Sequence, residues 1–205
     1  YTDQIRPGKP RWMPLNHQYN FETWPPLDPG KLIEFNPSCI QLPSGRWLGV
    51  IRRDKFPPIP GMATVWTIEL DDCLRPIGTP HLLLPQGEDP RAILLGSRVF
   101  IFFVTVEQTE DGCFSGTSMC IAECLVNETD APNFLHIQQV LKLPKNPVKN
   151  PNTHLTLDGW EKNWVPFPIS SEQIGIIYSH APWIVLTLNV NASSNQRNFE
   201  NAYQG

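Results

Sequence analysis

Proline is the feature of this sequence that most restricts its fold, because 22 of the 205 residues are proline. The prolines are spread along the chain, and each removes a backbone donor and clashes with the preceding helical turn. They exclude long helices and suit short strands joined by irregular loops. The longest apolar runs, such as Val99 to Val104, are strand-length, whereas a membrane-spanning helix needs about 20 apolar residues. The sequence therefore predicts an all-β protein with no membrane-spanning segment.

Length and composition limit the number of domains and the kinds of binding partner. A chain of 205 residues can form one sizeable domain. It carries 16 basic and 20 acidic residues, and 40% of its residues are apolar, so we expect it to fold. A weakly acidic protein has no electrostatic reason to bind nucleic acid or an anionic membrane. We therefore expect no nucleic-acid partner.

Cysteines, histidines and sequons bear on cofactors and location. Neither the five cysteines nor the five histidines show metal-ligand spacing, and no nucleotide-binding motif occurs, so we predict no metal and no cofactor. The odd number of cysteines leaves at least one thiol unpaired within the chain. Asn127-Glu128-Thr129 and Asn191-Ala192-Ser193 are N-glycosylation sequons. They favour a secretory or extracellular location over the cytoplasmic alternative.

One pattern occurs three times along the chain. Each copy is a polar cluster, an extended run, a short turn and a strongly apolar run, at residues 35–52, 88–104 and 161–179. β-Branched and aromatic runs around a Gly, Ser or Pro turn predict a β-hairpin in each copy.

Further strand candidates give each repeat about four strands, as in a propeller blade. Residues 62–70, 118–126 and 136–143 alternate between apolar and polar side chains. Supersecondary units repeated in this way predict a β-propeller. Propellers have about four to eight blades, so three blades do not close a ring, and we expect the N-terminal part of a longer protein. An open β-sandwich built from the same hairpins is the alternative.

The remaining segments show no strand pattern. Residues 1–30 are rich in Pro, Trp and Asn without a period, which predicts an extended arm before the propeller blades of residues 31–205. We expect a loop insertion at about residues 145–158 and a loop in the Asn-rich tail after Asn189.

The three polar clusters are the candidate functional residues. In a propeller the first strand of each blade lines the central channel, so the residues that begin these strands meet at one mouth. We therefore expect one polar ligand site, formed by Asn36, Asp89, Arg91, Lys162 and Asn163.

Asp89 is the candidate general acid or base of this site. Side chains alternate along a strand, so Glu88 should face away from Asp89 and Arg91 should return to the same face. Pro90 should hold Asp89 in an extended conformation. The planar fork of Arg91 can bind a carboxylate, a phosphate or vicinal hydroxyl groups. The alternative interpretation is an Asp-Arg pair that only fastens one blade to the next.

These clusters resemble the five-bladed propellers of glycoside hydrolase family 130, which includes mannoside phosphorylases and related β-mannoside-acting enzymes and transferases. The similarity extends from about residue 33 to residue 188. Its matching segments are Asn36-Pro37-Ser38, Arg52, Glu88-Asp89-Pro90-Arg91 and Glu161-Lys162-Asn163 with Trp164 to Phe167.

The resemblance implies a role for several residues. Asp89 would be the proton donor, acting on the glycosidic oxygen through a sugar hydroxyl. Asn36 and Arg52 would contact sugar, and Lys162 would help bind phosphate. The chain departs from the phosphorylases in residues 178–182, which include His180 but no arginine. This departure favours a transferase, a hydrolase or a non-catalytic relative.

The functional hypothesis is a carbohydrate-active enzyme that acts on a glycosidic bond, mannosidic if the resemblance holds, with Asp89 as general acid. Its ligand would be a carbohydrate or a sugar phosphate. The expected substrate-binding residues are Asn36, Arg52, Arg91, Lys162, Asn163 and His180. The alternative is a non-catalytic carbohydrate-binding or structural propeller, in which the same residues hold the blades together.

Overall fold

The structure is a computed structural model, and its regular elements are all β-strands. No helix occurs in the segments that it describes, and thus none there is long and apolar enough to cross a membrane. The predicted all-β class is confirmed. The described segments are residues 32–55, 61–130, 133–143, 164–180, 183–191 and 199–204.

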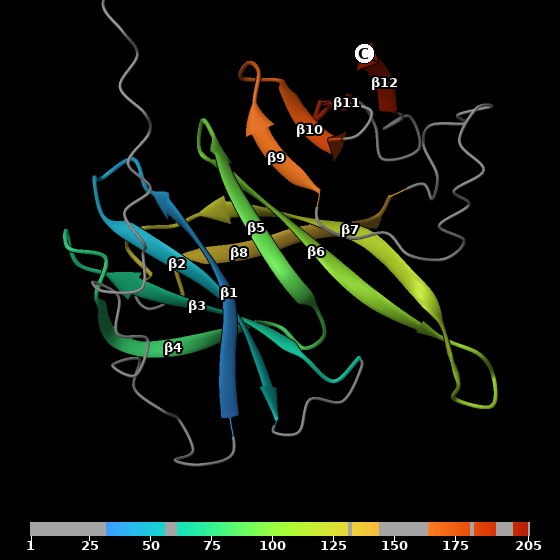
Figure 1. Cartoon of the computed structure of the whole chain (residues 1–205). Helices are drawn as coiled ribbons and strands as arrows, with labels where there is room; N and C mark the ends of the chain where they lie inside the picture. The colour runs from blue at the N-terminus through green and yellow to red at the C-terminus, as the bar shows by residue number, and fades with distance from the viewer. Residues whose placement is uncertain are drawn as a thin grey trace, which may run out of the picture.

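The strands form three separate four-stranded antiparallel sheets (Figure 1). The first sheet contains β1 (Leu32–Gln41), β2 (Trp47–Lys55), β3 (Thr64–Leu70) and β4 (Pro76–Leu84). The second contains β5 (Glu88–Leu95), β6 (Arg98–Gln108), β7 (Phe114–Val126) and β8 (Leu135–Lys142). The third contains β9 (Val165–Pro168), β10 (Gln173–His180), β11 (Trp183–Asn189) and β12 (Phe199–Gln204). In every sheet the strands pair in chain order, which is the meander of a propeller blade.

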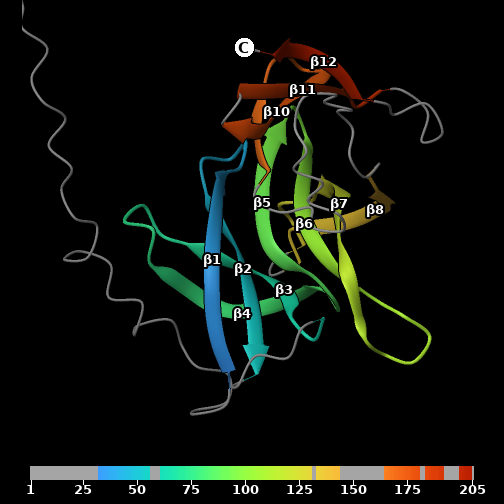
Figure 2. The same cartoon turned by 45° about the vertical axis from the view of Figure 1, so that its right-hand side comes forward.

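The first strand of each sheet lies toward the centre of the molecule. β5 contacts β1 on one side and β9 on the other, and Figure 2 shows β1 and β5 side by side. The three sheets therefore follow one another as consecutive propeller blades. They do not form the open β-sandwich that was the alternative, because the described strands make three sheets and not two facing ones.

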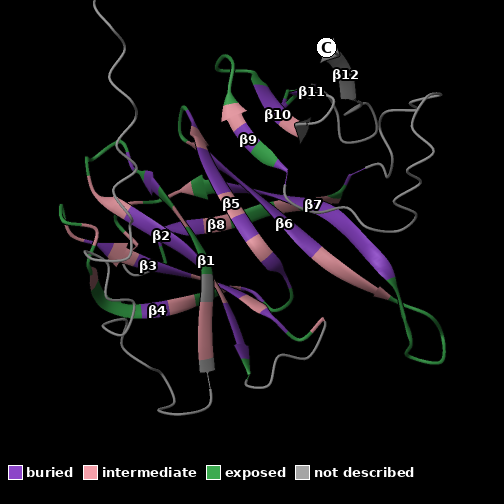
Figure 3. Cartoon of the chain, in the orientation of Figure 1, coloured by how far each residue is buried: buried purple, intermediate pink, exposed green. Residues whose placement is uncertain are grey.

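Two hydrophobic cores join the second blade to its neighbours. β6 is buried along most of its length (Figure 3), and its side chains alternate between the two cores. The core shared with the first blade contains Val99, Ile101 and Phe103. The core shared with the third blade contains Phe100, Phe102 and Val104. The fully apolar run in β6 thus reflects burial on both faces of the sheet.

The sequence patterns missed three strands, which are β4, β11 and β12. β4 contains Pro76, Gly78 and Pro80, which hide the strand pattern but are tolerated because β4 is an edge strand. The prediction of a loop throughout the tail after Asn189 is wrong, because β12 pairs with β11. The predicted arm at residues 1–30 and the insertion at residues 145–158 lie outside the described segments.

The cysteines are all free thiols. Cys120 and Cys124 belong to the core between the first two blades, where they pack as small apolar side chains. Burial and the charge of Glu123 raise the pKa of Cys124 to about 12, so this thiol stays protonated at neutral pH.

A glycine in the third blade makes room for an aromatic ring. Gly175 of β10 lies opposite Phe167 of β9, and a Cβ atom on Gly175 would lie 2.5 Å from Cε2 and 2.7 Å from Cε1 of that ring. We expect Gly175→Ala to lower the free energy of unfolding by about 1–3 kcal/mol through this overlap. Urea denaturation of Gly175→Ala with and without Phe167→Leu tests it. Additive effects of the two substitutions would contradict the overlap.

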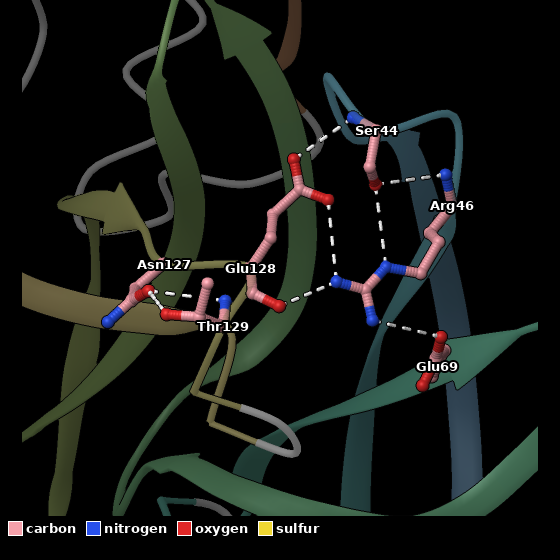
Figure 4. A network of polar contacts seen from close by, with 6 residues as sticks. All are labelled: Ser44, Arg46, Glu69, Asn127, Glu128 and Thr129. Carbon is pink, nitrogen blue, oxygen red and sulfur yellow. Dashed lines mark hydrogen bonds and ion pairs between the residues drawn. The ribbon is translucent and has the colours of Figure 1, made fainter.

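A polar clasp fastens the turn after β7 to the turn between β1 and β2 (Figure 4). Glu128 accepts a hydrogen bond of 3.0 Å from the backbone N–H of Ser44 through Oε1. Its backbone oxygen accepts one of 2.6 Å from Nη2 of Arg46. Nη1 of Arg46 lies 3.6 Å from Oε1 of Glu69 on β3. The clasp fixes the second blade against the first.

The clasp should make stability depend on pH in the acid range. Hydrogen bonds from Ser44 and the charge of Arg46 hold the pKa of Glu128 below its ordinary value. The ionised form therefore stabilises the fold above the unfolded-state pKa of about 4.3, and this contribution is lost as the pH falls through the folded-state pKa. We expect wild type to be more stable than Glu128→Gln at pH 7, with a difference that disappears in acid. A difference that stays constant in thermal unfolding between pH 7 and pH 3 would exclude an ionic clasp.

Candidate functional site

Two matching bulges shape the first strands of the first and second blades. The register of β1 against β2 shifts between Phe35 and Ser38, and that of β5 against β6 shifts between Glu88 and Arg91. Each bulge holds a non-glycine residue before a proline in the left-handed region, with φ of 47° at Asn36 and 50° at Asp89. Asn and Asp tolerate this region better than other residues with side chains. The expectation of an extended Asp89 before Pro90 is therefore wrong.

The bulges bring Asn36 and Asp89 into direct contact. Nδ2 of Asn36 donates a hydrogen bond to Oδ1 of Asp89. Behind the bulge, the backbone N–H of Ala92 donates to Oγ of Ser38 over 3.0 Å. The first strands of two blades are thus joined through the residues that form the bulges.

Arg52 of β2 completes the contact with Asp89. Nη1 of Arg52 donates to Oδ1 of Asp89 over 3.1 Å, and the same nitrogen lies 3.3 Å from Oε2 of Glu88. Both neighbouring carboxylates therefore reach one guanidinium group. The expectation that Glu88 faces away from Asp89 is wrong, because the bulge breaks the alternation of side chains.

Asp54 holds the other end of the Arg52 guanidinium. Nη2 of Arg52 donates to Oδ2 of Asp54 over 2.6 Å. Sequence reasoning missed Asp54, although it follows Arg52 by two residues on one strand and must share its face. The side chain of Asp54 is fully buried, that of Glu88 is 7% exposed, and those of Arg52 and Asp89 are each 15% exposed. We call Asn36, Arg52, Asp54, Glu88 and Asp89 the Arg52 cluster.

The charge of Arg52 is permanent in this cluster. Burial alone would lower the pKa of Arg52, but the hydrogen bonds to Asp54 and Asp89 and the charge of Glu88 raise it above its ordinary value. Among the described residues, the guanidinium of Arg52 is therefore paired with three carboxylates. Asp89 shares its counter-ion with Asp54 and Glu88 and does not hold it alone.

Arg53 lies on the opposite face of β2. Its Nε donates to Oε1 of Glu34 over 2.7 Å, and its guanidinium lies 4.6 Å from the ring centre of Trp66. Of the two arginines that end the first hairpin, only Arg52 therefore points toward Asp89.

The other predicted site residues are placed less fully. Nη1 of Arg91 donates to the backbone oxygen of Pro90 over 2.9 Å. His180 is the last residue of β10, and its side chain is outside the description. Lys162 and Asn163 precede Trp164 and lie outside the described segments.

The Arg52 cluster leaves one oxygen of Asp89 available. Both hydrogen bonds to this carboxylate go to Oδ1, and no group in the described segments donates to Oδ2. A carboxylate held at one oxygen and open at the other can exchange a proton with a bound hydroxyl group. Within the same segments, no group of three or more His, Cys, Asp or Glu side chains could hold a metal ion.

Comparison with known proteins gives structural neighbours alone. No protein-family model matches the sequence, and no curated protein matches it. An exo-1,5-α-L-arabinanase from a bovine ruminal metagenomic library is 10% identical, with a TM-score of 0.44 over 82% of this chain. A family 117 glycoside hydrolase from the marine bacterium Zobellia galactanivorans is 9% identical, with a TM-score of 0.48 over 85%. An α-L-arabinofuranosidase from Lactobacillus brevis is 11% identical, with a TM-score of 0.41 over 82%.

The chain is shorter than these neighbours. It spans 56% of the arabinanase, 70% of the family 117 enzyme and 51% of the arabinofuranosidase.

Proposed function

We propose that the protein is a carbohydrate-active enzyme that acts on a glycosidic bond, with Asp89 as the proton donor. The observation that carries the proposal is the pair of bulges at Asn36 and Asp89, which aligns both side chains with Arg52 where the first strands of two blades meet. Bulges of this kind re-aim side chains beside functional sites. A non-glycine residue in the left-handed region is strained and persists only where the surrounding fold holds it. Such residues are concentrated at functional sites.

The orientation of Asp89 supports proton donation. Asn36 and Arg52 fix Oδ1, so that the carboxyl group cannot turn freely while Oδ2 stays open to a ligand. A general acid must be held within hydrogen-bond reach of the oxygen that it protonates, or reach it through one hydroxyl group. The family 130 resemblance assigns that bridging role to a sugar hydroxyl.

The finer assignments belong to the same proposal. Arg91, Lys162, Asn163 and His180 would bind substrate around Asp89, and the bond would be mannosidic if the family 130 resemblance holds. The absence of an arginine at residues 178–182 favours a hydrolase or a glycosyltransferase over a phosphorylase. A single acid of this kind suits inversion, with water as nucleophile in a hydrolase.

A structural propeller is the second candidate, and one observation favours it. Within the described segments, both hydrogen bonds of the Asp89 side chain join the second blade to the first, through Asn36 and Arg52. In that case Asp89 fastens two blades and turns over no substrate.

Glycan binding and turnover on a sugar array, for wild type and Asp89→Asn, separate the two candidates. Asparagine keeps the shape of the side chain but cannot donate a proton as an acid. Turnover that is lost in Asp89→Asn while binding is kept supports the enzyme. Binding without turnover in both proteins supports a carbohydrate-binding propeller, and neither binding nor turnover supports the structural candidate.

A further inference from the structure

The turn after β7 carries an N-glycosylation sequon, whose asparagine side chain has no part in the proposed function. Asn127, Glu128 and Thr129 form a sequon within this turn. The backbone N–H of Asn127 donates to the oxygen of Phe134 over 2.9 Å, and that of Asp130 donates to the oxygen of Asn127 over 3.2 Å. The sequon therefore occupies a hydrogen-bonded surface turn.

The three side chains of the sequon point in two directions. Glu128 faces the molecule in the clasp with Ser44 and Arg46, whereas Asn127 and Thr129 are exposed. Oδ1 of Asn127 accepts hydrogen bonds from Oγ1 of Thr129 over 2.8 Å and from its N–H over 3.2 Å. Figure 4 shows Nδ2 of Asn127 directed away from Thr129 and from the clasp. No group in the described segments accepts a hydrogen bond from this nitrogen.

The asparagine of the second sequon, Asn191, has a different partner. Oδ1 of Asn191 accepts a hydrogen bond of 2.8 Å from Nη2 of Arg98, which ties this asparagine to the second blade. Asn127 makes no contact of this kind with an arginine in the described part of the chain. The side chains of Asn127 and Asn191 are therefore held by different partners.

We infer that Asn127 is the acceptor site for an N-linked glycan, which is independent of the proposed function. The donor class is a lipid-linked oligosaccharide pyrophosphate, used by a glycan-transferring enzyme of the secretory route. Nδ2 forms a bond to the anomeric carbon of the first sugar and loses one proton to a base. The bond from that carbon to the pyrophosphate oxygen breaks, and the lipid pyrophosphate leaves with the electron pair.

A glycan at Asn127 would leave the Arg52 cluster open. The backbone N–H of Val126, next to Asn127, donates to the oxygen of Ser97 over 3.2 Å, beyond the end of β5. Asp89 lies at the opposite end of β5, which is 8 residues long. At the rise of a β-strand, Ser97 and Asp89 are separated by roughly 25 Å. The glycan would cover the turn that clasps the first two blades and not the candidate site.

The test is intact-mass measurement of the full chain, produced with an added secretion signal in eukaryotic cells, before and after treatment with a peptide N-glycosidase. We expect one glycan that the glycosidase removes. Thr129→Ala should abolish the added mass while keeping Asn127, and Asn127→Gln should abolish it as well. Asn191→Gln, the matched control, should keep the full shift.

Two results would overturn the assignment. One is a wild-type chain without added mass, in the medium or in the microsomal fraction if it is retained there. The other is a shift that persists in Thr129→Ala. Thr129→Ser, which keeps the hydroxyl group and the sequon, should retain the glycan and so shows that the loss in Thr129→Ala is not misfolding.

Discussion

Arg52→Gln should lower the free energy of unfolding by about 3–5 kcal/mol, the range for removing one partner from a buried ion pair. The side chain of Arg52 is 15% exposed, and within the described segments Asp54, Glu88 and Asp89 share its positive charge. Glutamine is neutral, so these three carboxylates would lose the positive charge of Arg52. Urea denaturation monitored by tryptophan fluorescence measures the loss.

Arg46→Gln is the matched control for this substitution. Arg46 is also paired with two glutamates, but its side chain is 36% exposed. Solvent screens such a pair, so the expected cost is no more than about 1 kcal/mol. Equal costs for Arg52→Gln and Arg46→Gln would show that the Arg52 cluster is not a buried ionic network.

Trp164→Ala should also lower the free energy of unfolding by about 3–5 kcal/mol, as large-to-small changes of buried aromatic residues do. The side chain of Trp164 is 1% exposed in the core between the second and third blades. Its ring meets that of Tyr178 edge to face, with centroids 5.2 Å apart. The substitution removes this contact and leaves a cavity where β9 begins.

The loss in Trp164→Ala should spare the first blade, because the first blade packs in a separate core. Hydrogen exchange should increase in β10 and β11 while β2 and β3 of the first blade keep their protection. Val165→Ala is the control, since Val165 is the next residue but is 48% exposed. Exchange that increases equally in all three blades would contradict the separation of the cores.

The blades could be predicted from the sequence because their signals are local. Alternating or fully apolar runs around short turns, as in residues 88–104, correspond closely to β5 and β6. β4 and β12 could not be predicted in this way. They are outer strands of their sheets and pair with β3 and β11. This pairing is not visible in the local sequence, which lacks the apolar alternation that predicts a strand.

The members of the candidate site were partly predictable, but its geometry was not. Asn36, Arg52 and Asp89 were expected at the site, and the structure brings these three together. The positions of Glu88 and Asp89 follow from a bulge that places Asp89 at positive φ, which the rule for residues before proline disfavours. Asp89 is held in that conformation by contacts with Asn36 and Arg52 of another blade. The residues next to Asp89 in the sequence therefore do not predict it.

The most direct test of the central proposal is the dependence of Asp89→Asn on the leaving group. On a sugar identified by the array, two glycosides would be compared, one with a nitrophenol and one with a simple alcohol as leaving group. A nitrophenolate leaves without protonation, whereas the alcohol needs a general acid, which contributes about 10²–10⁴-fold. The proposal predicts that Asp89→Asn lowers kcat/KM by roughly this factor for the alcohol glycoside and far less for the nitrophenyl glycoside. Equal losses on both substrates, or turnover unchanged on both, would contradict Asp89 as the proton donor.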